Sequence, residues 1–309
     1  MSPDDQPSRH PPRRSWPHYG LYARVRDAIA ALPSHFRTET VIAGVVATDL
    51  FTLNQVIGAS VEEQVVATLN AMRPVWDPDG KYALYAFERQ AQTFPDVRLR
   101  CHSPASPRRP AVLMGIELKA WYLLAKEGEP SFRYTVTPAA CNPQDLLVVV
   151  PWALSNVVSG SPVLFEPYIE QARYAAEYRN YHWARVRRAK TDSAIVSPEC
   201  VCPYPSKSDQ IADRPLSDAG GNFGRLARTR VMDEYLHRAN KLPLCGIEAH
   251  YWRSFFSAFE EQATSEAVDN AINKLVRELR GGVELDTVLL SRVETILGAL
   301  REIALRATD

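Results

Sequence analysis

The sequence predicts a mixed α/β fold in which helices flank a block of β-strands. Apolar residues recur at helical spacing over residues 60–72, short apolar runs separated by turn residues fill residues 82–151, and helical patterns return after residue 166. Helix, strands, helix, strand and then helices is an order typical of a mixed β-sheet with helices packed against it.

The individual elements follow from these patterns and from their breaks. Pro74 ends the helix over residues 60–72, and a turn at residues 77–80 precedes the strands. Residues 190–221 are rich in Pro, Ser, Asp and Gly, and a loop of this length inside a compact domain often carries function. The other expected elements are helices within 19–48 and at 166–183 and 222–239, and strands at 82–87, 97–100, 112–123, 132–136 and 146–151.

The chain divides into three parts. Residues 1–18 are rich in Pro, Arg, Ser and Asp, a composition typical of a disordered tail. Residues 19–250 contain the strands and most of the helices and form the predicted domain. In residues 251–309 two helices, broken at Gly281-Gly282, form a C-terminal helical hairpin whose second helix carries a wide apolar stripe. Because that stripe must be covered, we expect the hairpin to pack on the domain or at a dimer interface.

The charge balance excludes some classes of partner. The 309 residues include 36 Lys and Arg and 36 Asp and Glu, so the net charge is zero. This argues against a histone-like or polybasic membrane-binding protein, whereas a local basic groove for DNA is compatible with a neutral whole. No apolar stretch is long enough to span a membrane, no signal peptide is evident, and the five cysteines lack the spacing of a zinc site. We expect a cytoplasmic protein with reduced thiols.

The strongest chemical signal lies in the strand-rich middle. Asp96 opens a short strand, and Glu117 and Lys119 lie inside the long apolar strand that follows. Side chains alternate along a strand, so Glu117 and Lys119 point to the same side, opposite apolar neighbours. A charged pair in an otherwise apolar strand is costly unless it has a task. Asp96 on the neighbouring strand would complete a cluster of two carboxylates and one ammonium.

Such a cluster fits metal-assisted hydrolysis of a phosphodiester. Two carboxylates suit Mg²⁺, a hard cation that prefers oxygen ligands, and the metal polarises the phosphate and lowers the pKa of a bound water. The lysine would stabilise charge that develops on the phosphate. The alternative is a structural salt bridge between Glu117 and Lys119 on an edge strand, because Glu-x-Lys triplets are common by chance.

The Pro-Asp pair ending at Asp96, followed by Glu117-Leu118-Lys119, resembles the PD-(D/E)xK signature of the restriction-endonuclease-like nuclease superfamily. The segments FPDVRL, GIELKAWYLLAKE and DLLVVVPWALSNV are similar to type II restriction endonucleases, over about residues 58–250. The resemblance implies a restriction-endonuclease-like core, a mixed sheet flanked by helices with the acidic residues on neighbouring strands. It also implies that Asp96 and Glu117 are metal ligands and that Lys119 is the catalytic lysine.

The same family often supplies another acid from a helix before the first core strand, and Glu62 and Glu63 are the candidates in this chain. At about 100° per residue, Glu62 lies about 60° from the centre of the apolar sector of its helix, and Glu63 lies about 160° from it. We therefore expect Glu62 to be the further metal or water ligand. In the alternative, both glutamates belong to a solvated helix face.

A glycine-rich block at residues 218–228, DAGGNFGRLAR, is the second signal. Glycines let backbone approach a ligand closely, and the start of a helix favours phosphate. Arg225 and Arg228 would share a helix face and could bind guanine, and Asn222 could read adenine. The block is also similar to one that recurs in restriction enzymes. The alternative is a turn that caps a helix with solvated arginines.

Basic and aromatic residues alternate over the helix at 166–183 and the residues after it. Phosphate contacts from Arg185 and Arg188, with Lys207 as a weaker candidate, would position DNA without reading its sequence. Alternatively, the helix has a solvated basic face and its aromatics lie in the core. The basic residues of this region are Arg173, Arg179, Arg185, Arg187, Arg188 and Lys190.

Together these observations and the resemblance predict a Mg²⁺-dependent, sequence-specific type II restriction endonuclease that cuts double-stranded DNA. The resemblance also implies that the cut leaves 5′-phosphate ends. A homodimer would match a palindromic site, and a cognate DNA methyltransferase would be its partner in the cell. The alternatives are a same-fold repair, junction-resolving or modification-dependent nuclease, and a non-catalytic DNA-binding protein. No GxSxG elbow or HExxH pair competes with the set of Asp96, Glu117 and Lys119.

Overall fold

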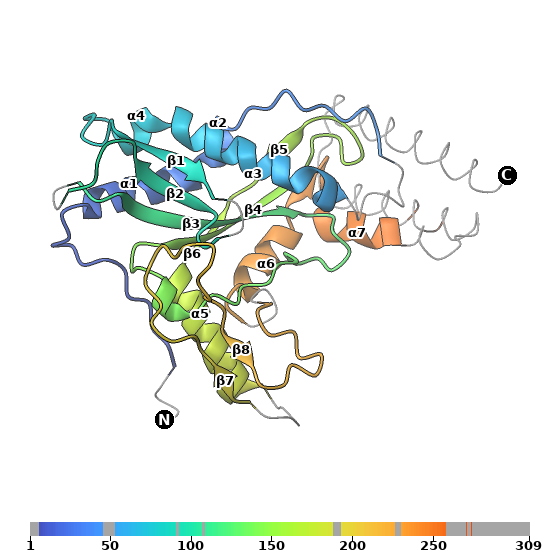
Figure 1. Ribbon diagram of the computed structural model, residues 1–309. Helices are drawn as coiled ribbons and strands as arrows, with labels where there is room; N and C mark the ends of the chain where they lie inside the picture. Colours follow the sequence, from blue (N-terminus) through green and yellow to red (C-terminus); the bar gives the residue numbers. More distant parts are fainter. Residues whose placement is uncertain are drawn as a thin grey trace.

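The computed structural model describes residues 6–45, 53–90, 93–106, 109–187, 193–225 and 230–257, together with the isolated residues 270 and 273. They form a mixed α/β arrangement around a curled sheet (Figure 1). The predicted class, a mixed β-sheet flanked by helices, is confirmed.

The sheet has six strands, β1 (Tyr85–Arg89), β2 (Val97–Cys101), β3 (Val112–Tyr122), β4 (Leu146–Leu154), β5 (Pro162–Leu164) and β6 (Tyr168–Gln171). Their order is β1-β2-β3-β4-β5, and β6 also pairs with β4. β3 and β4 are parallel, whereas the other pairs are antiparallel. β4 is buried along its whole length, as expected for a central strand that is covered on both faces.

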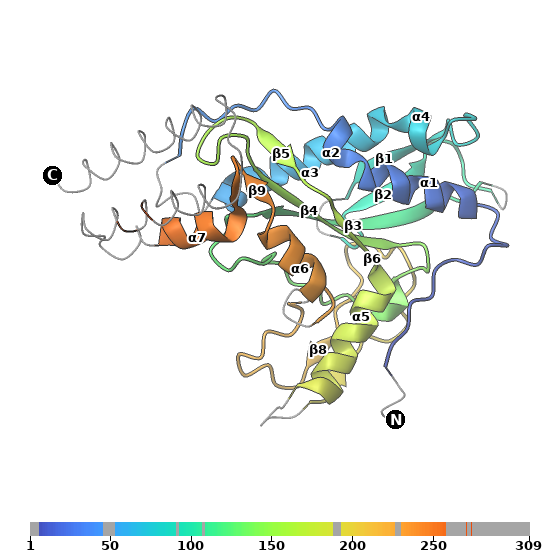
Figure 2. The same ribbon diagram turned by 180° about the vertical axis from the view of Figure 1, so that it is seen from behind.

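Helices of the N-terminal part are α1 (Tyr19–Ala30), α2 (Leu32–His35), α3 (Leu53–Ala71) and α4 (Arg73–Trp76). α3 lies along β1 and β3, and α1 packs beside α4, as Figures 1 and 2 show from the two sides. The helices after the sheet are α5 (Ala172–Tyr181), the π-helical turn η3 (His182–Val186), α6 (Asp233–Asn240) and α7 (Ala249–Ser257). α5 continues from β6 and projects below the sheet in Figure 1.

Alternation along the central strands separates two apolar clusters. Ile116 and Leu118 of β3 belong to the main core, which α1 and α3 complete. Leu147 of β4 belongs to a smaller cluster with residues of α5. Glu117 pairs with Leu147 across the parallel register, and cross-strand partners share a face. Glu117 therefore points to the face of the sheet on which α5 begins.

The predicted helix over residues 166–183 is wrong in its first part. Residues Tyr168–Gln171 form β6, which pairs antiparallel with the beginning of β4, and α5 begins only at Ala172. Pairing with a buried central strand satisfies the backbone groups of this segment, and such tertiary pairing overrides a local helical pattern.

The predicted helix over residues 222–239 is also shorter than expected, since α6 begins at Asp233. Asn222, Gly224 and Arg230 have left-handed backbone conformations, with φ of 58°, 94° and 64°. These values are incompatible with a right-handed helix. The described part of the glycine-rich block, residues 218–225, therefore lies in a loop.

Residues 132–136 do not form the predicted edge strand. Val136 makes a single bridge to Ala212. The carbonyl groups of Tyr134 and Val136 accept hydrogen bonds from the Arg179 side chain at 2.7 and 3.0 Å. A side chain thus satisfies backbone groups that a neighbouring strand was expected to satisfy.

The N-terminal segment predicted to be a disordered tail makes contacts with the domain. In the segment 6–18, part of the predicted disordered tail, Arg9 pairs with Glu170 at 2.7 Å and lies 4.4 Å from the centre of the Tyr174 ring. This part of the tail is therefore held against β6 and α5.

The hairpin predicted over residues 251–309 lies outside the described residues, apart from the end of α7 and two isolated positions. Among the described helices, none is long and apolar enough to cross a membrane.

Candidate functional site

Three charged side chains meet where β2 and β3 separate. Asp96 lies directly before β2, and Glu117 and Lys119 lie on β3. The Nζ atom of Lys119 lies 2.7 Å from Oδ2 of Asp96 and 3.0 Å from Oε1 of Glu117. The structure thus brings the two predicted carboxylates and the predicted lysine together around one ammonium group.

An unpaired edge of β3 fixes the position of Asp96. Pairing with β2 ends at Ile116, opposite Val97, so the next N–H groups on this edge face no strand. The N–H of Leu118 instead donates to Oδ2 of Asp96 at 3.2 Å. The same carboxylate oxygen therefore receives a backbone N–H and the Lys119 ammonium, which orients it toward Glu117.

Helix α3 covers the rest of this edge. The N–H of Ala120 donates to Oε1 of Glu62 at 3.0 Å, and the N–H of Tyr122 donates to Oδ1 of Asn54 at 3.1 Å. Asn54 and Glu62 are eight positions apart on α3 and so lie close to one face of the helix. This pair of contacts explains why α3 lies along β3 and why Glu62 comes next to the cluster.

Burial differs among the three clustered side chains. The Glu117 side chain is 9% exposed, whereas those of Asp96 and Lys119 are 31% and 23% exposed. Burial raises the pKa of Glu117 to about 7, although Lys119 acts in the opposite direction. Burial by itself would lower the pKa of Lys119, but Glu117 and Asp96 together outweigh it and raise that pKa. The site thus combines a lysine that is charged at neutral pH with a buried carboxyl group that titrates near neutrality.

Glu62 lies beside this cluster, and Glu63 does not. The second carboxylate oxygen of Glu62 lies 3.6 Å from Nη2 of Arg89, whose side chain is 43% exposed. Burial raises the pKa of Glu62, and the Ala120 N–H opposes that effect. Glu63 is exposed. The orientation expected from the helical wheel is therefore present, and the role of Glu62 as a ligand stays a prediction.

The carboxylates of the site can be tested against the needs of Mg²⁺. In the part of the chain that the structure describes, no three His, Cys, Asp or Glu side chains are arranged to hold a metal ion. Mg²⁺, however, commonly binds through one or two carboxylates and keeps several waters. Asp96 and Glu117 both lie beside the Lys119 ammonium and offer only oxygen, so the chemistry of this pair suits a hard cation. Glu62, tied to Ala120 and Arg89, is not part of the pair.

The described part of the glycine-rich block, residues 218–225, forms a loop that packs on η3 at Gly221. Gly221 lies against this turn so closely that a Cβ atom would come within 2.6 Å of both the Trp183 ring and Nη1 of Arg187. The guanidinium carbon of Arg187 in turn lies 3.1 Å from the Trp183 ring centre. A glycine is therefore required here for close packing.

Two of the predicted base-reading residues of this block, Asn222 and Arg225, do not lie on a helix. Asn222 is exposed and Arg225 is half-buried, and both lie in the loop. Arg228 lies outside the described residues. The prediction that Arg225 and Arg228 act from one helical face is therefore wrong at Arg225, while base contacts by Asn222 and Arg225 stay a prediction.

The predicted phosphate contacts also separate into groups. Arg185 on η3 and Lys207 in the loop between α5 and α6 are exposed. Arg173 forms an exposed ion pair with Glu177, one turn further along α5, at 2.9 Å. Arg188 and Lys190 lie outside the described residues.

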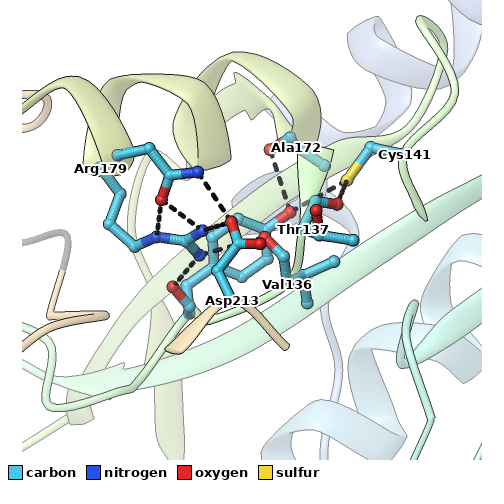
Figure 3. Close-up of polar contacts among 8 residues, drawn as sticks. Val136, Thr137, Cys141, Ala172, Arg179 and Asp213 are labelled. Carbon is cyan, nitrogen blue, oxygen red and sulfur yellow. Dashed lines mark hydrogen bonds and ion pairs between the residues drawn. The ribbon is translucent and has the colours of Figure 1, made fainter. Parts of the chain in front are cut away.

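Arg179 is buried, so the prediction that it belongs to a DNA-facing basic surface is wrong. Its side chain is 2% exposed, and Nη2 lies 2.5 Å from Oδ2 of Asp213. Figure 3 shows the guanidinium group between α5 and the segments that carry Asp213 and Val136. Asn180 adds a hydrogen bond to the same Asp213 oxygen at 2.7 Å. Arg179 therefore attaches the long loop to α5.

Sequence reasoning missed three polar residues that join distant segments of the chain. Asn54, Asp145 and Asp213 each bond to groups far away in the sequence. A signal exists only for Asp145, which stands directly before the apolar run of β4 and is fully buried. Asp213 lies in an irregular segment with no periodicity from which its partner could be found.

Comparisons of this chain with models of protein families, with curated proteins and with solved structures found no match. A function for the chain is therefore inferred from the geometry of its site and from the motif that Asp96, Glu117 and Lys119 form.

Proposed function

We propose that this protein is a Mg²⁺-dependent endonuclease that cleaves double-stranded DNA at a specific sequence. The observation that carries the proposal is the meeting of Asp96, Glu117 and Lys119 where β2 and β3 separate. A purely stabilising salt bridge needs one carboxylate, whereas this ammonium is shared by two, one of which is buried. A buried ion group is weak evidence for stability, and a catalytic task accounts for its cost.

The chain's own residues suit the chemistry of phosphodiester hydrolysis. Asp96 and Glu117 would hold Mg²⁺, which when bound polarises the phosphate and lowers the pKa of a water. The Lys119 ammonium lies between the two carboxylates, where it would donate to a phosphate oxygen and stabilise the negative charge of the transition state. Attack of water on phosphorus breaks the bond to the 3′-oxygen, so the products are a 5′-phosphate and a 3′-hydroxyl group.

Exposed groups near α5 and its loop support binding to duplex DNA. Arg185 and Lys207 would contact phosphates, which position the duplex without reading sequence. Asn222 and Arg225 would contact base edges, because amide and guanidinium groups match adenine and guanine. Because the net charge of the chain is zero, binding to DNA would depend on these local groups and not on a general positive field.

The biological setting that fits this activity is restriction of foreign DNA in the cytoplasm, within a restriction-endonuclease-like fold. A homodimer would bring two such sites to the two strands of a palindromic sequence. A cognate DNA methyltransferase would protect the host's own copies of that sequence.

The test is incubation of the purified full-length protein with unmodified phage DNA, with and without Mg²⁺. Discrete fragments that require Mg²⁺ are the expected result. A smear would indicate a nonspecific or structure-directed nuclease of the same fold. A mobility shift without cleavage at any Mg²⁺ concentration would make the protein a DNA-binding module and contradict the proposal.

A further inference from the structure

The loop between α5 and α6 is attached to the strands of the candidate site at Tyr204 and Pro205. The hydroxyl of Tyr204 donates to Oδ1 of Asp145 at 2.9 Å, and Nη2 of Arg98 donates to the carbonyl of Pro205 at 3.0 Å. Asp145, directly before β4, is 0% exposed. In Figure 1 this loop runs beside α5, below the sheet.

Asp145 carries the first of these attachments into the site. Its Oδ1 also accepts the N–H of Gly115 on β3 at 2.7 Å. Gly115 stands two positions before Glu117, and it packs so closely on Pro95 that a Cβ atom would overlap with the proline ring. Pro95 in turn directly precedes Asp96. One carboxylate oxygen therefore connects the Tyr204 hydroxyl to backbone that carries both candidate metal ligands.

Arg98 forms the second attachment, on β2. The Nη2 atom that holds Pro205 also donates to the carbonyl of Phe94 at 3.1 Å. The guanidinium group lies 5.8 Å from the centre of the Tyr204 ring. Phe94 and Arg98 stand two positions before and two positions after Asp96. The loop is thus bonded to Arg98, and the same guanidinium group spans the turn that presents Asp96.

The outer end of the same segment is a surface turn. Residues 206–210 are all exposed, and they include Lys207. The N–H of Ser206 donates to Asp209 at 2.8 Å, and the Ser206 and Ser208 hydroxyl groups lie 2.8 Å apart. Only two residues separate Lys207 from Tyr204, so a DNA contact at Lys207 would lie close to the buried contacts.

We propose that Tyr204 and Asp145 are positioning residues, which couple contact between the 206–210 turn and duplex DNA to the alignment of Asp96 and Glu117. The inference rests on the proposed endonuclease function and adds to it a route by which binding controls cleavage. A displacement of about 1 Å at a catalytic group can slow a reaction about 100-fold, so a small shift at Gly115 is felt at Glu117. Directional hydrogen bonds to a buried carboxylate transmit such a shift better than apolar contacts, which allow sliding.

The test compares Tyr204→Phe with Tyr235→Phe in the full-length protein. Both changes remove one tyrosine hydroxyl that donates a hydrogen bond, to Asp145 at 2.9 Å and to the Glu166 carbonyl at 2.6 Å, and keep the ring. Tyr235 lies on α6, away from the site strands, and so controls for a general loss of stability. Affinity for the cleaved duplex is measured with Ca²⁺, the single-turnover cleavage rate with Mg²⁺ at saturating enzyme, and the melting temperature for each variant.

Tyr204→Phe is expected to keep its duplex affinity within about threefold and to cleave about tenfold more slowly or worse, which corresponds to about 1.4 kcal/mol in the barrier. Tyr235→Phe is expected to match the wild-type protein in both measurements. A Tyr204→Phe rate within about threefold of wild type, or an equal loss of rate in Tyr235→Phe, overturns the coupling. If the wild-type protein itself cuts no duplex, the proposed function fails and this inference fails with it.

Discussion

The carboxylate of Glu62 accepts the backbone N–H of Ala120 at 3.0 Å, and this contact joins helix α3 to the strand that carries Glu117 and Lys119. Glu62 therefore has two properties that a substitution must separate, a hydrogen-bond acceptor for the edge of β3 and a negative charge beside the site. Glutamine keeps the acceptor and removes the charge, whereas alanine removes both.

Replacement of Glu62 should therefore reveal which property cleavage needs. If the charge assists Mg²⁺ or water, Glu62→Gln should slow cleavage roughly tenfold and require more Mg²⁺, since about 1.4 kcal/mol gives tenfold. Glu63→Gln on the exposed side of α3 is the matched control and should change stability by at most about 0.5 kcal/mol. Cleavage rates are compared over a range of Mg²⁺ concentrations. Normal activity in Glu62→Gln with loss in Glu62→Ala would limit Glu62 to its structural contact with β3.

The stability of the protein should fall as pH rises toward neutrality. Burial raises the pKa of Asp145 to about 7 and that of Glu117 to about 7. The corresponding groups of an unfolded chain titrate near about pH 4, so between about pH 4 and 7 the folded state binds more protons than the unfolded state. The stabilisation from these protons is fully present below about pH 4 and is lost as pH rises through about 7.

Urea unfolding from about pH 5 to 8 tests this pH dependence by comparing the wild-type protein with Asp145→Asn. The variant has lost one of the two titrating groups, so its free energy of unfolding should fall less steeply, by up to about 1.4 kcal/mol per pH unit. Parallel curves for the two proteins would show that Asp145 does not take up a proton on folding.

The buried ion pair between Arg179 and Asp213 should matter far more for stability than a surface pair on the same helix. Arg179→Met leaves the Asp213 carboxylate buried without its partner, which costs about 3–5 kcal/mol. Arg173→Met breaks the exposed pair with Glu177 and should cost at most about 1 kcal/mol. Denaturant unfolding of both variants gives the comparison. Similar losses in the two would mean that the Asp213 segment is solvated in solution.

Arg225 should discriminate between DNA sequences, and Arg185 should not. If Arg225 contacts a base edge, Arg225→Ala should cost roughly 1–3 kcal/mol on the cognate duplex and little on random DNA. If Arg185 contacts a phosphate, Arg185→Ala should weaken binding to both duplexes equally. It should also lower the slope of log affinity against log salt concentration by about one. Affinities measured with Ca²⁺ at several salt concentrations decide, and equal losses on both duplexes for Arg225→Ala would assign it to phosphate.

The parts of the fold that could be predicted are those that local patterns determine. Alternation along β3 put Glu117 and Lys119 on one side, and the structure has both beside Asp96. The apolar sector of α3 correctly turned Glu62 toward the sheet and Glu63 away from it. These predictions need only the period of a helix or a strand.

The parts that failed depend on contacts between distant residues. Tyr168–Gln171 looks helical locally, and only pairing with β4 makes it a strand. The helix expected after Asn222 is interrupted by left-handed backbone at Gly224 and Arg230, and the Gly224 carbonyl accepts a hydrogen bond from the N–H of the distant Tyr134. Arg179 looks like other arginines of its helix, and nothing near it in sequence indicates Asp213 as its partner.

Single-turnover cleavage by Lys119→Ala is the most direct test of the site. The ammonium is expected to stabilise the transition state more than the bound duplex, so the variant should bind the cleaved DNA in Ca²⁺ and cut it at least about 100-fold more slowly in Mg²⁺. Lys241→Ala, at an exposed position after α6, is the control and should cut at the wild-type rate. Cleavage by Lys119→Ala at close to the wild-type rate would contradict the assignment of Asp96, Glu117 and Lys119 as the active site.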